Sequence, residues 1–80
     1  MNPRVKTVLA NDGFTLAIHF ENGETRVFDM KPYLEHGIFR ELKDLSYFKA
    51  VQVVMGTVQW PHGQDVCPDT LYESGVPCNQ

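Results

Sequence analysis

The strongest constraint on the fold is a regular alternation of apolar and polar residues that is bounded by two turn-forming pairs. Within Phe14–Phe20 every second residue is apolar, which predicts a strand with one buried face. Asp12–Gly13 precedes this segment and Asn22–Gly23 follows it. Both dipeptides are typical of tight hairpin turns, and Asn22–Gly23 favours type I′. With alternating segments at 5–10 and 25–30, the first thirty residues predict a three-stranded antiparallel meander.

The two outer strands of this meander have their own side-chain pattern. In residues 25–30, Phe28 and Met30 share one face and Val27 lies on the other. In residues 5–10, strict alternation separates two sets of side chains. They are Val5, Thr7 and Leu9 on one face, and Lys6, Val8 and Ala10 on the other.

The middle of the chain changes to a helical pattern. Pro32 suits the first position of a short helix, and Gly37 suits its C-cap. The apolar spacing in residues 38–43 predicts a helix or a 3₁₀ turn, with a strand as the alternative. Asp44 is expected to cap one further helical turn.

The last third of the chain contains two more predicted strands, at 51–55 and 57–60, followed by a loop at 62–65. A short C-terminal helical turn comes next, with Asp69 as its expected N-cap and Gly75 just past its end.

These elements predict an α+β domain: an antiparallel three-stranded meander, a short helical segment, two further strands and a C-terminal helical turn. The 80 residues suffice for a single domain, 1–80. We expect an ordered core at about 3–75 and a loose tail at 76–80.

The charge of the chain disfavours a protein that binds nucleic acid directly. Its formal net charge is −3, from 7 basic and 10 acidic residues, and the basic residues are spread along the sequence. Binding to phosphates requires clustered positive charge. No apolar run is long enough to span a membrane, and the N-terminus has no apolar leader, so we expect a cytoplasmic protein.

The two cysteines, Cys67 and Cys78, are expected to be free thiols in a reducing compartment, with a disulfide as the alternative. Cys67 lies near His62, Asp65 and Asp69. Their spacing matches no established metal-ligand pattern, and Cys67 has only His62 as a nearby base. We therefore expect no catalytic residue, no metal and no cofactor.

Large amphipathic side chains near the ends of the predicted elements suggest an interaction surface instead. Trp and Tyr are enriched where proteins bind one another. The candidate residues are Trp60, His62, Asp65, Asp69 and Tyr72. They could equally be a folding signature, in which Trp60 lies over the sheet and the aspartates hold turns.

The C-terminal part of the chain also resembles a known family. Its pattern G-x-[IV]-x-W-x-x-G-x-D-[LIV]-x-P-[DE]-x-L-Y is similar to one in the bacterial domain-of-unknown-function family 2442 (DUF2442). Upstream, F-D-[LM] and D-x-x-x-F-x-x-V stretches are similar too, so the resemblance covers about residues 3–74. The matching residues are Phe28, Asp29, Met30, Leu34, Gly37, Phe39, Asp44, Phe48, Val51, Gly56, Val58, Trp60, Gly63, Asp65, Val66, Pro68, Asp69, Leu71 and Tyr72.

The resemblance implies a small α+β domain. Some members of the family precede a helix-turn-helix, and others stand beside a small companion gene, as in toxin–antitoxin pairs. The leading hypothesis is a non-catalytic protein-interaction or regulatory domain, an antitoxin-like member of a two-gene pair. It would have a protein partner and could form a homodimer. The alternatives are a nucleic-acid-associated module, and a small enzyme or metal-binding protein that uses the His62/Asp65/Cys67 loop.

Overall fold

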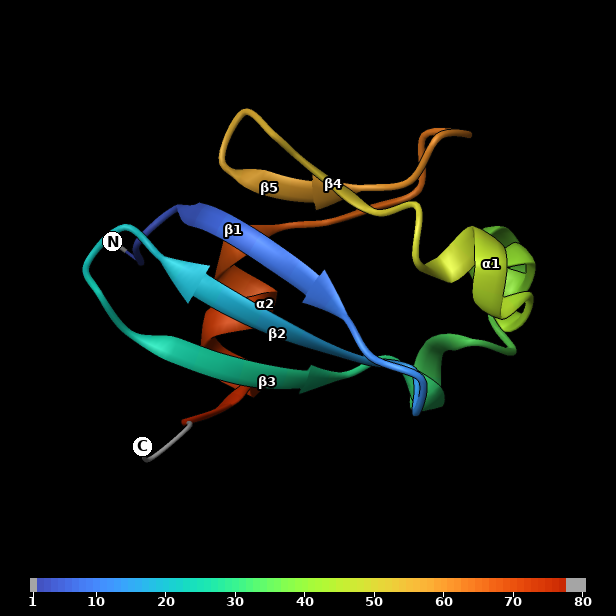
Figure 1. Cartoon of the computed structure of the whole chain (residues 1–80), viewed down its shortest axis with the longest axis horizontal. Coiled ribbons are helices and arrows are strands. Elements are labelled where there is room, and N and C mark those ends of the chain that lie inside the picture. The colour runs from blue at the N-terminus through green and yellow to red at the C-terminus, as the bar shows by residue number, and fades with distance from the viewer. Residues whose placement is uncertain (1, 78–80) are drawn as a thin grey trace.

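Two antiparallel sheets and four short helices make up the fold in the computed structural model, which describes residues 2–77 (Figure 1). The predicted α+β class is therefore confirmed. Within residues 2–77, no helix has the length and apolar character that crossing a membrane requires. In chain order the elements are β1 (Val5–Ala10), β2 (Thr15–Phe20), β3 (Thr25–Asp29), the 3₁₀ helices η1 (Lys31–Tyr33) and η2 (Gly37–Lys43), α1 (Leu45–Phe48), β4 (Gln52–Val54), β5 (Thr57–Gln59), β6 (Asp65–Val66), α2 (Pro68–Ser74) and β7 (Val76–Pro77).

The first sheet contains the predicted meander, with strand order β1-β2-β3-β7. The expectation of a loose tail is wrong at its start. Val76 pairs with Val27, and Pro77 pairs with Arg26. A strand of two residues has no periodicity that a sequence pattern could reveal. The remainder of the expected tail, 78–80, lies outside the described residues.

A bulge in β1 changes which of its residues face inward. Val5 pairs with Phe20 and Thr7 pairs with His19, so β1 has one extra residue between these pairs. An extra residue shifts the alternation of the strand to the opposite face. The predicted shared face of Val5 and Leu9 is therefore wrong, because Val5 is buried whereas Leu9 is 64% exposed.

The hairpin turns differ from the predicted type. Gly23 has a φ of 92°, but Asn22 lies outside the left-handed region, so the predicted type I′ turn is wrong. The Gly23 N–H donates to the Phe20 carbonyl over 3.0 Å, as in a three-residue loop that ends on a left-handed glycine. A two-residue turn of the I′ kind instead joins β4 to β5, where Met55 has a φ of 52° and Gly56 of 81°.

The predicted helical pattern in the middle of the chain is mostly confirmed. Residues 38–43 lie within η2, so the strand alternative is wrong. Gly37 begins η2 rather than ending the preceding helix, which corrects its expected role as a C-cap. Asp44 caps α1 as predicted, because its carboxylate accepts a hydrogen bond of 3.1 Å from the Ser46 N–H.

The second sheet has the order β4-β5-β6 and is followed by α2. The predicted strands at 51–55 and 57–60 correspond to β4 and β5. The expected loop at 62–65 ends one residue early, because Asp65 and Val66 pair with β5. Like β7, β6 is too short to show a pattern.

The start of α2 corrects one prediction and its end confirms another. Cys67, not Asp69, occupies the N-cap position, because Pro68 begins the helix. Proline suits this place since it has no N–H to leave unpaired. Asp69 lies in the first turn, where its charge complements the exposed N–H groups. Gly75 is the C-cap, as predicted.

The core lies on the inner face of the four-stranded sheet. Figure 1 shows α2 behind this sheet, with the β4–β5 hairpin along one side and α1 beyond one end. Most elements contribute a buried side chain, and η1 lies directly between the buried Met30 and Leu34. The buried hydrophobic residues are Val5, Leu16, Ile18, Phe20, Phe28, Met30, Leu34, Leu42, Phe48, Val58, Trp60, Val66 and Leu71.

Candidate interaction site

Trp60, the first candidate residue, is a core residue. Its side chain is 2% exposed and lies against the Phe48 ring, with 6.0 Å between the ring centroids. The indole Nε1–H donates to the Phe48 carbonyl over 2.8 Å, so the polar group of this buried ring is satisfied. Trp60 therefore joins the end of β5 to α1 and presents no surface to a partner.

His62 takes part in a hydrogen-bond network that sequence reasoning missed. Its Nδ1 lies 2.8 Å from Oε2 of Glu41, and its backbone N–H donates to the Tyr47 hydroxyl over 2.9 Å. Gln64, only 5% exposed, donates to Oε1 of Glu41 and accepts from the Tyr47 hydroxyl. A buried glutamine with all its contacts inside the protein holds the loop in place.

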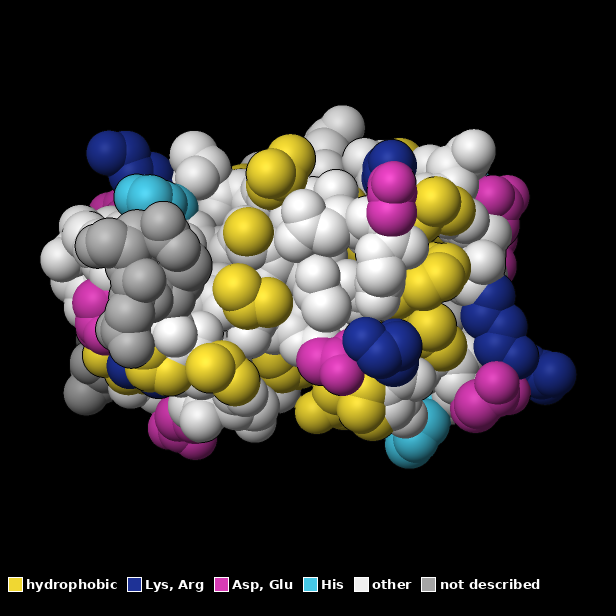
Figure 2. Space-filling view, turned by 60° about the horizontal axis from the view of Figure 1, so that its bottom comes forward, with side chains coloured by type: hydrophobic (Ala, Val, Ile, Leu, Met, Phe, Trp, Pro, Cys, Tyr) yellow, Lys and Arg dark blue, Asp and Glu magenta, His cyan; other side chains and the backbone are white. Residues whose placement is uncertain are grey.

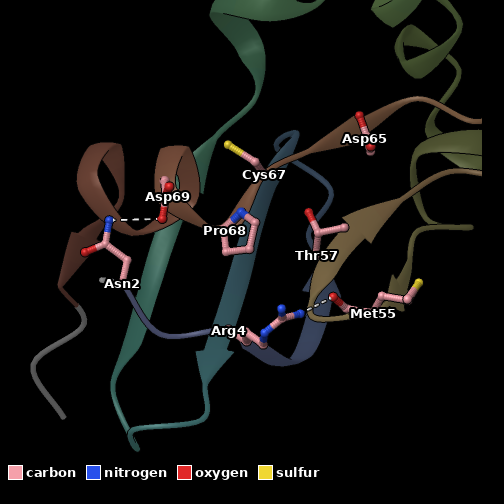
Figure 3. Close-up of a pocket in the computed structure, with 8 residues that line it drawn as sticks. All are labelled: Asn2, Arg4, Met55, Thr57, Asp65, Cys67, Pro68 and Asp69. Carbon is pink, nitrogen blue, oxygen red and sulfur yellow. Dashed lines mark hydrogen bonds between the residues drawn. The ribbon is translucent and has the colours of Figure 1, made fainter.

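Asp65 and Asp69 line a different feature, an open hollow of about 350 Å³ between the N-terminal segment, the β4–β5 turn and the start of α2 (Figure 3). Arg4, one of its lining residues, donates to the Met55 carbonyl over 2.7 Å. Asp69 accepts a hydrogen bond of 3.3 Å from the Asn2 amide. The eight lining residues are Asn2, Arg4, Met55, Thr57, Asp65, Cys67, Pro68 and Asp69.

Cys67 also lines this hollow, and its thiol is exposed. The Thr70 hydroxyl, 3.2 Å from the sulfur, lowers the pKa of the Cys67 thiol through a hydrogen bond, with further help from the Thr70 backbone N–H. Within residues 2–77, no three His, Cys, Asp or Glu side chains are grouped as a metal ion would require. Cys78, the other cysteine expected to be a free thiol, lies outside the described residues.

Tyr72 fastens α2 to β3. The Arg26 guanidinium carbon lies 3.9 Å from the centre of the Tyr72 ring, and Arg26 Nη1 donates to the Tyr72 carbonyl over 2.7 Å. The Tyr72 hydroxyl donates to Glu24, which also pairs with Arg26 at 3.1 Å. The hydrogen bond from Tyr72, followed by those from Asn22 and Arg26, lowers the pKa of Glu24.

The five candidate residues therefore do not form one site. Trp60 lies in the core, His62 contacts η2 and α1, the two aspartates line the hollow, and Tyr72 packs on β3. Trp60 is buried and bonded to α1, and Tyr72 joins α2 to Glu24 and Arg26. These contacts support the interpretation of the motif as a folding signature.

The outer face of the four-stranded sheet carries a feature that the sequence analysis did not identify. The strand register aligns one apolar side chain from each strand in a single row across the face: Leu9 pairs with Ala17, Ala17 with Val27, and Val27 with Val76. We call this set the apolar row. Leu9 is 64% exposed and Val76 is 66% exposed. Figure 2 shows hydrophobic side chains following one another across this face.

The rows on either side of the apolar row are polar and carry little charge. One consists of Thr7, His19 and Thr25, and the other contains Thr15 and Asp29. Among these register-paired residues only Asp29 has a formal charge, whereas charged residues make up 21% of the chain. Depletion of charge at the centre of a patch is characteristic of protein interfaces.

The sheet edges are less accessible than this face. At the β1 edge, the Val5 N–H donates to the Gly56 carbonyl over 2.9 Å, so the β4–β5 turn covers part of the strand. At the other edge, β7 consists of Val76 and Pro77, and proline has no N–H with which to extend a sheet. These two edges therefore offer few free backbone groups to an additional strand.

Comparison with known proteins identifies a family. No curated protein and no solved structure matches the chain. A family model described as "Protein of unknown function (DUF2442)" matches residues 5–77. The match extends from the first residue of β1 to the last residue of β7 and so includes all of both sheets. The chain belongs to the DUF2442 family.

Proposed function

We propose that this protein is a small non-catalytic interaction domain that regulates a protein partner through the outer face of its four-stranded sheet. The observation that carries the proposal is the apolar row of Leu9, Ala17, Val27 and Val76. Two of its members are about two-thirds exposed, in a domain whose small size leaves little apolar surface to spare.

The surroundings of the apolar row support the same function. Isolated exposed hydrophobic residues are ordinary on protein surfaces, but four from four neighbouring strands make a continuous patch. The patch has one formal charge beside it, on Asp29, and this carboxylate already contacts Lys31 over 3.0 Å. A partner could cover this face without leaving a charge buried and unpaired.

An antitoxin-like role in a two-gene pair is the form of this proposal that the family resemblance suggested. In that case the product of the neighbouring gene is the partner. Co-expression of the two genes, followed by purification through a tag on this chain, tests the idea directly. We expect the two proteins to co-purify in a fixed ratio.

A matched pair of variants tests whether the partner binds to the apolar row. The L9K/V76K variant adds two charges to the apolar row, at positions exposed enough for the fold to tolerate them. The I38K/M55K variant adds the same charges at exposed hydrophobic residues, 66% and 88% exposed, outside the sheet face. We expect L9K/V76K to lose the partner and I38K/M55K to retain it. Equal binding by both variants would show that this face is not the binding surface.

A further inference from the structure

We propose that the outer face of the four-stranded sheet also binds a second copy of this chain, face to face, in a weak symmetric dimer. This inference rests on the proposed function, because it assigns an occupant to the same face. It differs in naming the chemistry of that occupant: a four-stranded sheet face identical to this one, with an apolar centre and Asp29 as the one formal charge among its register-paired residues.

The first argument is the symmetry of the face. In a dimer with twofold symmetry, each patch contacts the same patch on the other copy. A twofold axis that runs along the apolar row places each of its members opposite its own counterpart. The row is then the dry centre of two sheets packed about 10 Å apart.

The second argument is the complementarity of the polar rows. The same axis places the row with His19 and Thr25 opposite the partner's row with Thr15 and Asp29. Thr25 and His19 are joined through a 2.9 Å hydrogen bond, so two groups that can form hydrogen bonds lie opposite the row that contains the partner copy's carboxylate. Each copy has a net charge of −3, but the contact brings no two acidic side chains directly opposite each other.

The size of the face sets the expected strength. Three strand spacings make the apolar row about 14 Å long. The area that such a face covers is well below the roughly 800 Å² per partner of a stable interface. The dimer should therefore be populated at high protein concentration and dissociate on dilution.

Analytical ultracentrifugation from micromolar to millimolar protein tests this inference. We expect the average mass of the wild-type chain to rise towards that of a dimer with concentration. L9K/V76K should stay monomeric, whereas I38K/M55K should associate like the wild type. Circular dichroism and thermal unfolding establish that each variant is folded. A wild-type chain that stays monomeric at millimolar concentration overturns the proposed dimer.

A second variant tests the orientation of the two copies. His19→Asp places a new carboxylate opposite the partner's Asp29 row, and like charges across an interface oppose binding. We expect the dissociation constant to increase about tenfold or more. His36→Asp makes the same change at an exposed histidine outside the face, and should leave association unchanged. Equal dissociation constants for the two variants would exclude this orientation.

The two proposals fail separately. If the wild-type chain stays monomeric but the L9K/V76K variant still loses the protein partner, the dimer is overturned and the interaction function is supported. A concentration-dependent dimer without any co-purifying partner supports the second copy as occupant and contradicts the regulatory function.

Discussion

At the scale of single residues, Met55 combines a side chain and a backbone conformation that disfavour each other. It has a φ of 52°, a left-handed conformation that costs residues other than glycine about 1–2 kcal/mol. Its side chain is 88% exposed, so packing offsets little of that cost. The turn between β4 and β5 would be more stable with asparagine, which tolerates this conformation.

Met55→Asn should therefore stabilise the fold by about 1 kcal/mol. The Met55 carbonyl that accepts from Arg4 belongs to the backbone and remains in place. Denaturant unfolding of the two proteins measures the difference. Ile38→Asn is the control, because Ile38 is also exposed but does not have a positive φ. If both variants gain a similar amount of unfolding free energy, the gain comes from replacing an exposed apolar side chain with a polar one and not from the turn.

Gly75 is required for a different reason: its surroundings leave no room for a side chain. A Cβ atom at Gly75 would lie 2.5 Å from the Leu71 carbonyl oxygen and 3.1 Å from the Arg26 Cβ. Backbone on one side and a half-buried arginine on the other leave no room without displacement. Gly75 is thus the point where α2 turns closely back onto β3.

We expect Gly75→Ala to lower the free energy of unfolding by about 1–3 kcal/mol, the usual cost of overpacking. Gly13→Ala provides the matched control, since a Cβ there meets nothing within 4 Å and its φ is not positive. Thermal or urea unfolding of the three proteins suffices. If the two variants are equally stable, the close approach at Gly75 is not what the fold requires.

At the scale of elements, long alternating segments could be read from the sequence and short ones could not. The strand Thr15–Phe20 shows three buried residues at a period of two, and this signal is local. β6 and β7 have two residues each, so their pairing depends on tertiary contacts. The bulge in β1 also leaves no local mark, yet it decides that Leu9 faces outward.

The candidate site was predictable only in part, for the same reason. The Trp60–Tyr72 segment was recognisable as a motif, but its residues separate onto different neighbours. Glu24 and Tyr72 are 48 positions apart, and sequence spacing carries no information about such a contact. The apolar row required the register of four strands, including the bulge and β7, before its members could be aligned.

The Tyr72–Glu24–Arg26 contact predicts how stability changes with pH. The pKa of Glu24 is lowered in the folded state from its ordinary value of 4.5. The ionised Glu24 carboxylate therefore adds its full contribution to the free energy of unfolding above pH 4.5. That contribution is lost as the pH falls through the lower pKa of the folded state. We expect Glu24→Gln to be less stable than wild type at neutral pH, with the gap in unfolding free energy closing as the pH falls below 4.5.

Unfolding free energies measured across this range for both proteins check the prediction. The carboxyls of Asp29 and Glu35 also have lowered pKa values, from contacts with Lys31 and Lys43 respectively. They contribute equally to the two proteins, so the difference between the curves isolates Glu24. Parallel curves at all pH values would mean that the Glu24 charge does not contribute to holding α2 on β3.

At the scale of the whole molecule, the arrangement of charge matters more than the total. Four of the seven basic residues form ion pairs with neighbouring carboxylates, and these pairs are distributed over the surface. They are Arg26–Glu24, Lys31–Asp29, Lys43–Glu35 and Lys49–Asp12. A phosphate would have to compete with a carboxylate already in contact at each of these positions.

The wild-type chain should therefore not bind DNA or RNA, even at low salt, where binding to phosphates is strongest. Fluorescence anisotropy with a labelled duplex and a labelled single strand measures this. The D12K/E35K variant is the positive control, because it replaces two pairs with clusters of like positive charge. We expect weak binding by that variant that disappears as salt is added. Salt-sensitive binding by the wild type would instead show that these ion pairs open to phosphate, and would favour a nucleic-acid-associated role over a protein partner.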